Sequence, residues 1–443
     1  MTRKMKDSGI EWIGEIPEDW TIMKLKSVVE TTKGYAFKSE MFSDNGVPVV
    51  KASDLKKQTV VKSEAFIREE IANDYVNVKL STNDILMSTV GSTPDVVNSA
   101  VGQLALLPKE LDNSLLNQNV VRWMPKKRVD NLFLFYYLST HAFRKYLDLI
   151  AHGTANQASL TLKEMLDYSV PIPTDKEQLK IRNYLNTKCS KIDETIEKQK
   201  QVIEKLKAYK QSVITEAVTK GLKPDVPMKY SGIEWIGEIP EHWNYFRIKY
   251  NTYLKGRIGW QGLKASEFID DGPYLVTGTD FEGGSVNWNK CYHISKERYD
   301  EAPDIHIKIG DLIITKDGTV GKLAYIDSLP GLASLNSHLL VVRPTTEYYT
   351  NKYLFWVLSS SIFKMYTGLS QDGSIMSSLS QEKINNFSFP IPTIEEQTSI
   401  ICYLEKKCSE IDRYILQKDV LIQKLTEYKK SLIYECVTGK REV

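Results

Sequence analysis

The stretch TDKEQLKIRNYLNTKCSKIDETIEKQKQVIEKLKAYKQSVITEAVT at residues 174–219 decides the architecture of the chain. It holds no glycine or proline, and it begins with a capping box in which Thr174 accepts from the third backbone N–H while Glu177 reaches back to the cap. The preceding Ile-Pro ends any earlier element. The sequence therefore predicts one long helix, which would span roughly 60 Å at about 1.5 Å per residue.

From residue 189 onward, the inward positions of this helix alternate by three and four, which is the spacing of a coiled-coil seam. These positions are Cys189, Ile192, Ile196, Gln199, Ile203, Leu206, Lys210 and Val213. A seam of this kind needs a partner helix.

The partner lies in the same chain, at residues 393–438. It has its own capping box in Thr393 and Glu396. Each seam residue lies 219 positions after its counterpart, and the polar interruptions fall in the same layers: Cys408, Ile411, Ile415, Lys418, Ile422, Leu425, Lys429 and Leu432. Two independent surface helices are the alternative, but the shared register favours a mutual coiled coil.

The seam lysines predict the direction of this pairing. In an antiparallel pair Lys210 faces Ile411, and the lysine stem packs while its ammonium group reaches water. Lys429 faces Ile192 in the same way. A parallel pair would stack the two lysines on each other, which like-charge repulsion disfavours. The helices are therefore predicted to be antiparallel.

The repeat extends beyond the helices. MKDSGIEWIGEIPEDW at 5–20 recurs as MKYSGIEWIGEIPEHW at 228–243, and PIPT at 171–174 recurs at 390–393. Repetition of the tryptophans in both halves favours a packing role for them. The chain is thus two copies of one plan, with four predicted segments: a first domain at 1–173, a helix at 174–221, a second domain at 222–392 and a helix at 393–443.

Composition is that of an ordinary globular protein, with 443 residues, 42% hydrophobic and 26% charged side chains, and a net charge of +2. No apolar run is long enough to cross a bilayer and no signal-peptide core is present, so we expect a cytoplasmic protein without a membrane partner. The five cysteines form no CxxC pair, which indicates neither a disulfide framework nor a metal site.

Each half combines short strand-like runs with an apolar helical stretch, which predicts an α+β fold. The ends of the halves are nearly identical, whereas their middles differ greatly: GSTPDVVNSAVGQ in the first half stands against DGTVGK in the second. This contrast predicts a shared framework that carries two different binding sites.

A visible catalytic motif is missing. GTVGK at 318–322 has the glycines and lysine of a phosphate loop but not its full spacing, and a hairpin turn fits it better. There is no GxSxG or HExxH motif, and the histidines have no ligand spacing. We therefore predict no catalytic residues, and a self-contained nuclease is the enzymatic rival.

Polar loops in the two middles are the candidates for DNA contacts, because amides suit adenine and basic side chains suit guanine or phosphate. Solvent-exposed connections are polar for other reasons too, so each residue alone carries little weight. The candidates are Lys38, Ser92, Thr93, Asn119 and Gln157 in the first half, and Trp260, Gln261, Lys316, Asp317, Thr319, Asn336, His338 and Gln371 in the second.

Taken together, these features resemble the specificity subunit of type I restriction-modification enzymes. The resemblance rests on the IEWIGEIPEDW and IEWIGEIPEHW segments, the two IPT-x-x-EQ helix starts and GDLIITKDGTVGK, and it covers essentially the whole chain.

The resemblance implies two target-recognition domains, each reading one half of a split double-stranded DNA sequence, with an antiparallel coiled coil that sets their spacing. It also implies modification subunits that use S-adenosylmethionine to methylate adenine, and restriction subunits that use ATP and magnesium. No cofactor is expected in this chain.

Because the two middles differ, the target should be asymmetric, with a fixed spacer. Four residues inserted near Ala217 would add about 6 Å, or roughly two base pairs. A duplicated coiled-coil scaffold or ligand-binding protein without DNA specificity is the alternative function.

Overall fold

The computed structural model describes most of the chain, which forms two compact units. One comprises Met1–Gln199 with Val420–Val443, and the other comprises Lys200–Asp419. The described residues are 3–10, 13–91, 101–154, 157–258, 263–368 and 378–443.

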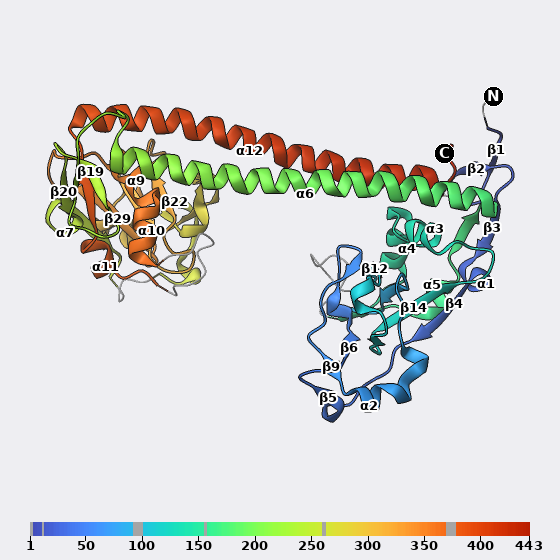
Figure 1. Cartoon of the computed structure of the whole chain (residues 1–443). Helices are drawn as coiled ribbons and strands as arrows, with labels where there is room; N and C mark the ends of the chain where they lie inside the picture. The colour runs from blue at the N-terminus through green and yellow to red at the C-terminus, as the bar shows by residue number, and fades with distance from the viewer. Residues whose placement is uncertain (1–2, 11–12, 92–100, 155–156, 259–262, 369–377) are drawn as a thin grey trace. The chain divides into compact units, whose positions relative to one another are not determined.

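Two long helices, α6 (Asp175–Lys220) and α12 (Ile394–Val437), contribute one segment each to both units. Within each unit the two segments run in opposite directions (Figure 1). In the first unit Cys189 shares a core with Leu432. In the second unit Ala217 shares a core with Leu404. The predicted antiparallel pairing is confirmed.

The seam lysines have partners that the sequence reading did not foresee. Lys429 Nζ lies 2.7 Å from Asp193 Oδ2, and Lys210 Nζ lies 2.6 Å from Asp412 Oδ2. Each aspartate follows a seam isoleucine by one position, so its carboxylate meets the lysine stem as it leaves the seam. The prediction that water receives these ammonium groups was therefore incomplete, because each one forms an ion pair.

The predicted seam side chains lie on the inner faces of the helices, buried or half-buried. They are Ile192, Ile196, Ile203, Leu206, Ile411, Ile415, Ile422 and Leu425. Burial also raises the pKa of Cys189 and of Cys408 to about 11, so both thiols stay protonated at neutral pH.

The first domain contains a six-stranded sheet among its described residues, with strand order β4-β14-β10-β12-β8-β7. Its ladders are antiparallel except for β12 with β8. The strands are β4 (Val29–Lys33), β14 (Val120–Pro125), β10 (Ile85–Ser88), β12 (Leu104–Leu106), β8 (Thr59–Val60) and β7 (Leu55–Lys56).

The second domain repeats the first four strands of this order as β21-β29-β26-β27. The hairpin predicted around GTVGK is formed, because β26 and β27 pair antiparallel on either side of it. The strands are β21 (Thr252–Gly256), β29 (Leu339–Pro344), β26 (Leu312–Thr315) and β27 (Leu323–Tyr325). This mixture of sheets and helices confirms the α+β class.

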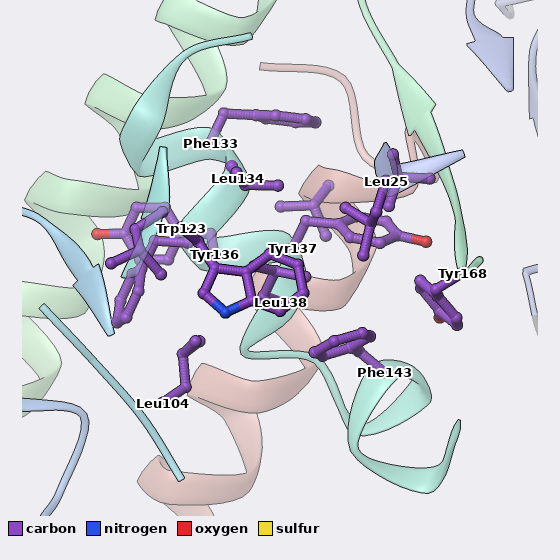
Figure 2. Packing of buried hydrophobic residues seen from close by; sticks show 14 of the residues in the cluster. Leu25, Leu104, Trp123, Phe133, Leu134, Tyr136, Tyr137, Leu138, Phe143 and Tyr168 are labelled. Atoms are coloured by element: carbon purple, nitrogen blue, oxygen red, sulfur yellow. The ribbon is translucent and has the colours of Figure 1, made fainter. Parts of the chain in front are cut away.

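The helix after the sheet joins each domain to the long helices. In the first domain α3 (Asn131–Leu138) is apolar on every side, because Trp123 and the segments of α6 and α12 surround it. Figure 2 shows Trp123 packed among the α3 side chains, with Phe143 of α4 (His141–Ile150) and Tyr168 close by. In the second domain α9 (Asn351–Ser359) and α10 (Ser361–Thr367) take these places.

One repeated tryptophan in each domain packs against the start of a long helix. Trp20 and Trp243 are 0% and 1% exposed. The Trp20 indole N–H donates to Glu177 Oε2 at 2.9 Å, and the Trp243 indole N–H donates to Glu396 Oε2 at 3.2 Å. This geometry agrees with the packing role that their repetition predicted. Over the described ranges, no helix combines the length and the apolar character needed to cross a bilayer.

Candidate nucleic-acid interface

Predicted site residues of the second domain meet at one end of its sheet, where β26 ends and β29 begins. The Lys316 N–H donates to the His338 carbonyl at 2.9 Å, and the Leu379 N–H donates to the Lys316 carbonyl at 2.7 Å. Three segments far apart in the sequence are thus joined by backbone hydrogen bonds. We call this end of the sheet the second shelf, formed by Lys316, Asp317, Thr319, Asn336 and His338.

The side chains of the second shelf lie close enough to act together. Asp317 Oδ2 lies 3.5 Å from Lys316 Nζ and 3.4 Å from His338 Nδ1. The Asn336 side-chain oxygen accepts from the His338 N–H at 2.6 Å. His338 and Thr319 remain exposed to solvent. The shelf therefore presents hydrogen-bond donors and acceptors to a ligand, which is the chemistry that reads base edges.

The backbone beneath the second shelf is packed tightly. A Cβ atom on Gly256 would lie 2.7 Å from Leu340 Cδ2 and 2.9 Å from the Leu339 carbonyl, so this position needs glycine. The next residue, Arg257, is buried and donates through Nε to the Leu335 carbonyl at 2.8 Å. Burial lowers the pKa of its guanidinium below the ordinary arginine value. This packing holds the backbone of the second shelf in place.

The first domain has the same backbone arrangement at the same end of its sheet. The Thr89 N–H donates to the Asn119 carbonyl at 2.9 Å, and the Leu160 N–H donates to the Thr89 carbonyl at 2.9 Å. The Asn117 side-chain oxygen accepts from the Asn119 N–H at 3.4 Å, as Asn336 does from His338. These residues form the first shelf: Thr89, Asn117 and Asn119.

The turns beside the two shelves are also equivalent. The Gly102 N–H donates to the Ser88 carbonyl at 2.9 Å, and the Gly321 N–H donates to the Thr315 carbonyl at 2.9 Å. The side chains that this common backbone carries are different. Asn119 stands where the second shelf has His338, and Thr89 stands where it has Lys316.

An aromatic cluster beside the first shelf was missed by the sequence reading. The Tyr35 N–H donates to the Leu116 carbonyl at 2.9 Å, so Tyr35 borders the strand that leads to Asn117. Its ring lies 4.6 Å from that of Tyr75 and 5.1 Å from that of Phe37, yet Tyr35 is 41% exposed. Aligning KGY at 33–35 with KGR at 255–257 would have identified Tyr35 as a candidate, because it occupies the place of Arg257 in the repeat.

The remaining predicted residues fall into two groups. Lys38 is exposed near the Tyr35 cluster, where its Nζ lies 3.9 Å from a carboxylate oxygen of Glu40 rather than on the first shelf. The backbone of Gln157 belongs to β16 (Gln157–Ser159), which pairs with β11 (Val90–Gly91) next to Thr89. Five candidates lie outside the described residues: Ser92, Thr93, Trp260, Gln261 and Gln371.

No group of three or more histidine, cysteine, aspartate or glutamate side chains gathers around a potential metal position within the described ranges.

Comparison with known proteins places this arrangement in a family. Residues 17–208 and 258–418, well over half of the chain, match the family described as type I restriction modification DNA specificity domain. The chain is 23% identical over 452 residues to the type I restriction enzyme EcoBI specificity subunit of Escherichia coli, covering 99% of this chain and 90% of that protein.

Two further matches agree. The MjaVIII specificity subunit of Methanocaldococcus jannaschii is 32% identical over 201 residues, which cover 44% of this chain and 45% of that protein. A solved structure from work on complex assembly and conformational transition of the type I R-M system shares the fold, with a TM-score of 0.71, 15% identity, and coverage of 96% of this chain and 99% of that one. The chain belongs to the family of type I restriction-modification DNA specificity subunits.

Proposed function

We propose that the chain reads an asymmetric, bipartite double-stranded DNA target, with each shelf reading one half across a spacer of fixed length. One observation carries this proposal: the two shelves have the same backbone hydrogen bonds but different side chains. A common backbone would present both shelves to DNA in the same way, while Asn119 and His338 offer different hydrogen-bonding groups to the bases. Family membership favours this reading over a duplicated scaffold without DNA specificity.

We assign the chemistry to partner subunits. Modification subunits with S-adenosylmethionine would methylate adenine in the bound target, and restriction subunits with ATP and magnesium would cleave DNA. This chain would direct both activities without catalysing either. The purified chain with magnesium should leave duplex DNA intact, and cleavage by the chain alone would contradict this assignment.

The shelf residues give a matched pair of variants. His338→Ala should weaken binding by about 1–3 kcal/mol for each base that it no longer reads, and it should relax selection only in the second half-site. Asn119→Ala, at the equivalent place in the first domain, should relax only the first half-site. Selection of bound sequences from a randomised duplex pool, with the modification subunit present, measures both effects.

Each variant serves as the control for the other, because both keep the shared backbone. If either variant relaxes both halves equally, or if neither changes the selected sequence, then the shelves are not the reading surfaces.

The flank of the coiled coil that carries Tyr209 and Tyr414 is the surface we assign to the modification subunits. Both tyrosines belong to the second unit and are 49% and 48% exposed. Each tyrosine comes one position before a seam residue. Ile214 comes one position after a seam residue, and it packs in the core of the second domain. In an antiparallel pair, positions that precede the seam lie on one flank, so the tyrosines lie on the flank away from the domain.

Such positions usually carry charged residues in a coiled coil. Tyrosine is instead enriched in protein interfaces, where it combines a large apolar area with a polar group. Lys407 Nζ lies 5.9 Å from the Tyr209 ring centroid, which adds a positive charge beside the aromatic surface. Tyr428 repeats the pattern in the first unit, where it is 50% exposed.

The double variant Tyr209→Ser with Tyr414→Ser should weaken association with the modification subunit by about 2 kcal/mol or more, roughly 30-fold, if these tyrosines lie at the centre of the interface. The matched control is Tyr245→Ser with Tyr250→Ser, which removes two exposed tyrosines from the second domain. Titration of labelled chain with modification subunit measures both. If the two double variants bind the modification subunit with equal affinity, then the flank with Tyr209 and Tyr414 is not its binding surface.

A further inference from the structure

The first unit contains a groove between its domain and its segments of α6 and α12 that is distinct from the first shelf. Its volume is about 960 Å³. The β7–β8 turn, the start of α4 and the C-terminal part of α12 line it. The described lining residues include five lysine or arginine side chains and one carboxylate: Lys57, Arg144, Lys145, Lys429, Lys430 and Asp193.

Two of these positive charges have partners within the protein. Lys429 pairs with Asp193 at 2.7 Å, and Arg144 Nε pairs with Asp148 Oδ1 at 2.9 Å. Lys57, Lys145 and Lys430 are exposed, and no described carboxylate lies within ion-pair distance of them. The groove therefore has an excess of positive charge over its described lining.

Over its described lining, the corresponding groove of the second unit has no such excess of positive charge. Its volume is about 640 Å³, and its lining holds three lysines and three carboxylates: Lys210, Lys352, Lys364, Asp327, Glu405 and Asp412. Lys210 pairs with Asp412, and Lys352 Nζ lies 2.7 Å from Glu405. At the places of Lys57, Lys145 and Lys430, the second half has the neutral residues Gly283, Met365 and Gln211.

The backbone of the first turn supports a role for its side chains. Lys57 and Gln58 have φ angles of +51° and +63°, in the left-handed region that residues other than glycine, asparagine and aspartate seldom occupy. The second half meets the same requirement with Gly283 and Gly284, at +58° and +87°. The second half thus shows that two glycines are enough to form this turn, yet the first half has a lysine and a glutamine there. Backbone strain at residues other than glycine is often found at functional sites.

One side chain of the groove also contacts the turn beside the first shelf. Arg144, which lines the groove, donates through Nη1 to the Val101 carbonyl at 2.8 Å. Val101 begins the turn in which the Gly102 N–H binds Ser88. DNA seated on the first shelf would therefore extend towards the groove. Its phosphate backbone carries the charge that complements the ammonium groups of Lys57, Lys145 and Lys430.

We propose that Lys57, Lys145 and Lys430 bind the phosphodiester backbone of the target beside the first half-site, without reading its bases. This inference rests on the proposed DNA-reading function. The proposal makes the two half-sites unequal in their contacts with the protein. The first half-site would be held by base contacts and by the positively charged groove, whereas the described lining of the second unit's groove has no excess charge to add. The first half-site therefore supplies the larger share of the salt-dependent affinity.

The test grafts the residues of the second half into the first groove: Lys57→Gly, Lys145→Met and Lys430→Gln. Because the second half folds with these residues, the graft should be tolerated. In complex with the modification subunit, the slope of log K against log salt should become shallower by about 0.9 for each phosphate that is no longer neutralised. Affinity at physiological salt should fall at least tenfold, while the selected sequence stays the same.

The control variant removes equal charge elsewhere, by Lys109→Gln, Lys127→Gln and Lys176→Gln, and should keep the wild-type slope. An unchanged slope in the graft overturns the phosphate assignment. Loss of binding to the modification subunit by the graft, with binding kept by the control variant, would show that an acidic protein segment fills the groove, and this too overturns the phosphate assignment. Failure of the wild-type complex to select any sequence would count against the proposed function instead.

Discussion

Inserting four residues into each long helix, after Lys200 in α6 and after Val420 in α12, is expected to lengthen the DNA spacer by about two base pairs. Four residues add about 6 Å of helix, and two base pairs cover about 6.8 Å. The insertion also turns one end of each helix by about 40° relative to the other. Two base pairs turn the duplex by about 70° in the same sense, at 10–10.5 base pairs per turn, so the domains keep nearly the same groove.

The structure also decides where this insertion belongs. Ala217, near which the sequence suggests placing it, is 2% exposed in the core of the second unit. Lengthening the helix there would disrupt the packing of α9 and α10. Lys200 and Val420 are both exposed instead, and each lies at the point along its own helix where one unit ends and the other begins. Insertion at both places keeps the seam in register on either side, as a four-residue stutter does in coiled coils.

The selected sequences of the insertion variant give the result directly. A control that replaces four exposed residues at the same places with the inserted sequence, without added length, should keep the wild-type spacer. If the lengthened variant binds DNA and keeps the original spacer, then the helices do not set the distance between the half-sites.

A second variant should change the target completely. Replacing residues 222–392 with a second copy of residues 1–173 would place the first shelf in both halves. Because α6 and α12 run in opposite directions in each unit, the two copies should read the same sequence on opposite strands. The new target should be an inverted repeat of the first half-site, with loss of methylation at the original asymmetric site.

The reciprocal chimera, with residues 222–392 in both places, is the matched control. It should select an inverted repeat of the second half-site. The two chimeras together should thus recover both halves of the wild-type target. An asymmetric target for either chimera would contradict the assignment of one half-site to each domain.

The framework could be predicted from the sequence because its signals are periodic or repeated. The seam isoleucines recur every three or four residues, and a helical period can be recognised without knowing the fold. The direction of the helices followed from Lys210 and Lys429, whose parallel stacking would be repulsive. Their aspartate partners were missed, because a residue beside a seam has no signal of its own.

The candidate site was less predictable, because its residues meet only through the fold. His338 and Asp317 are 21 positions apart, and Tyr35 borders a strand more than 80 positions later. Polar loops indicated the right regions, but polarity does not tell which loops share one end of a sheet. Comparing the halves position by position, as with KGY and KGR, would have identified Tyr35. The left-handed turn at Lys57 has no sequence signal, because lysine and glutamine do not mark such turns.

Methylation profiling of a genome that carries this chain and its modification subunit is the most direct test of the central claim. The account predicts one methylated motif made of two different half-sites, separated by a spacer of constant length. A contiguous motif, a symmetric motif or a spacer of variable length would contradict it.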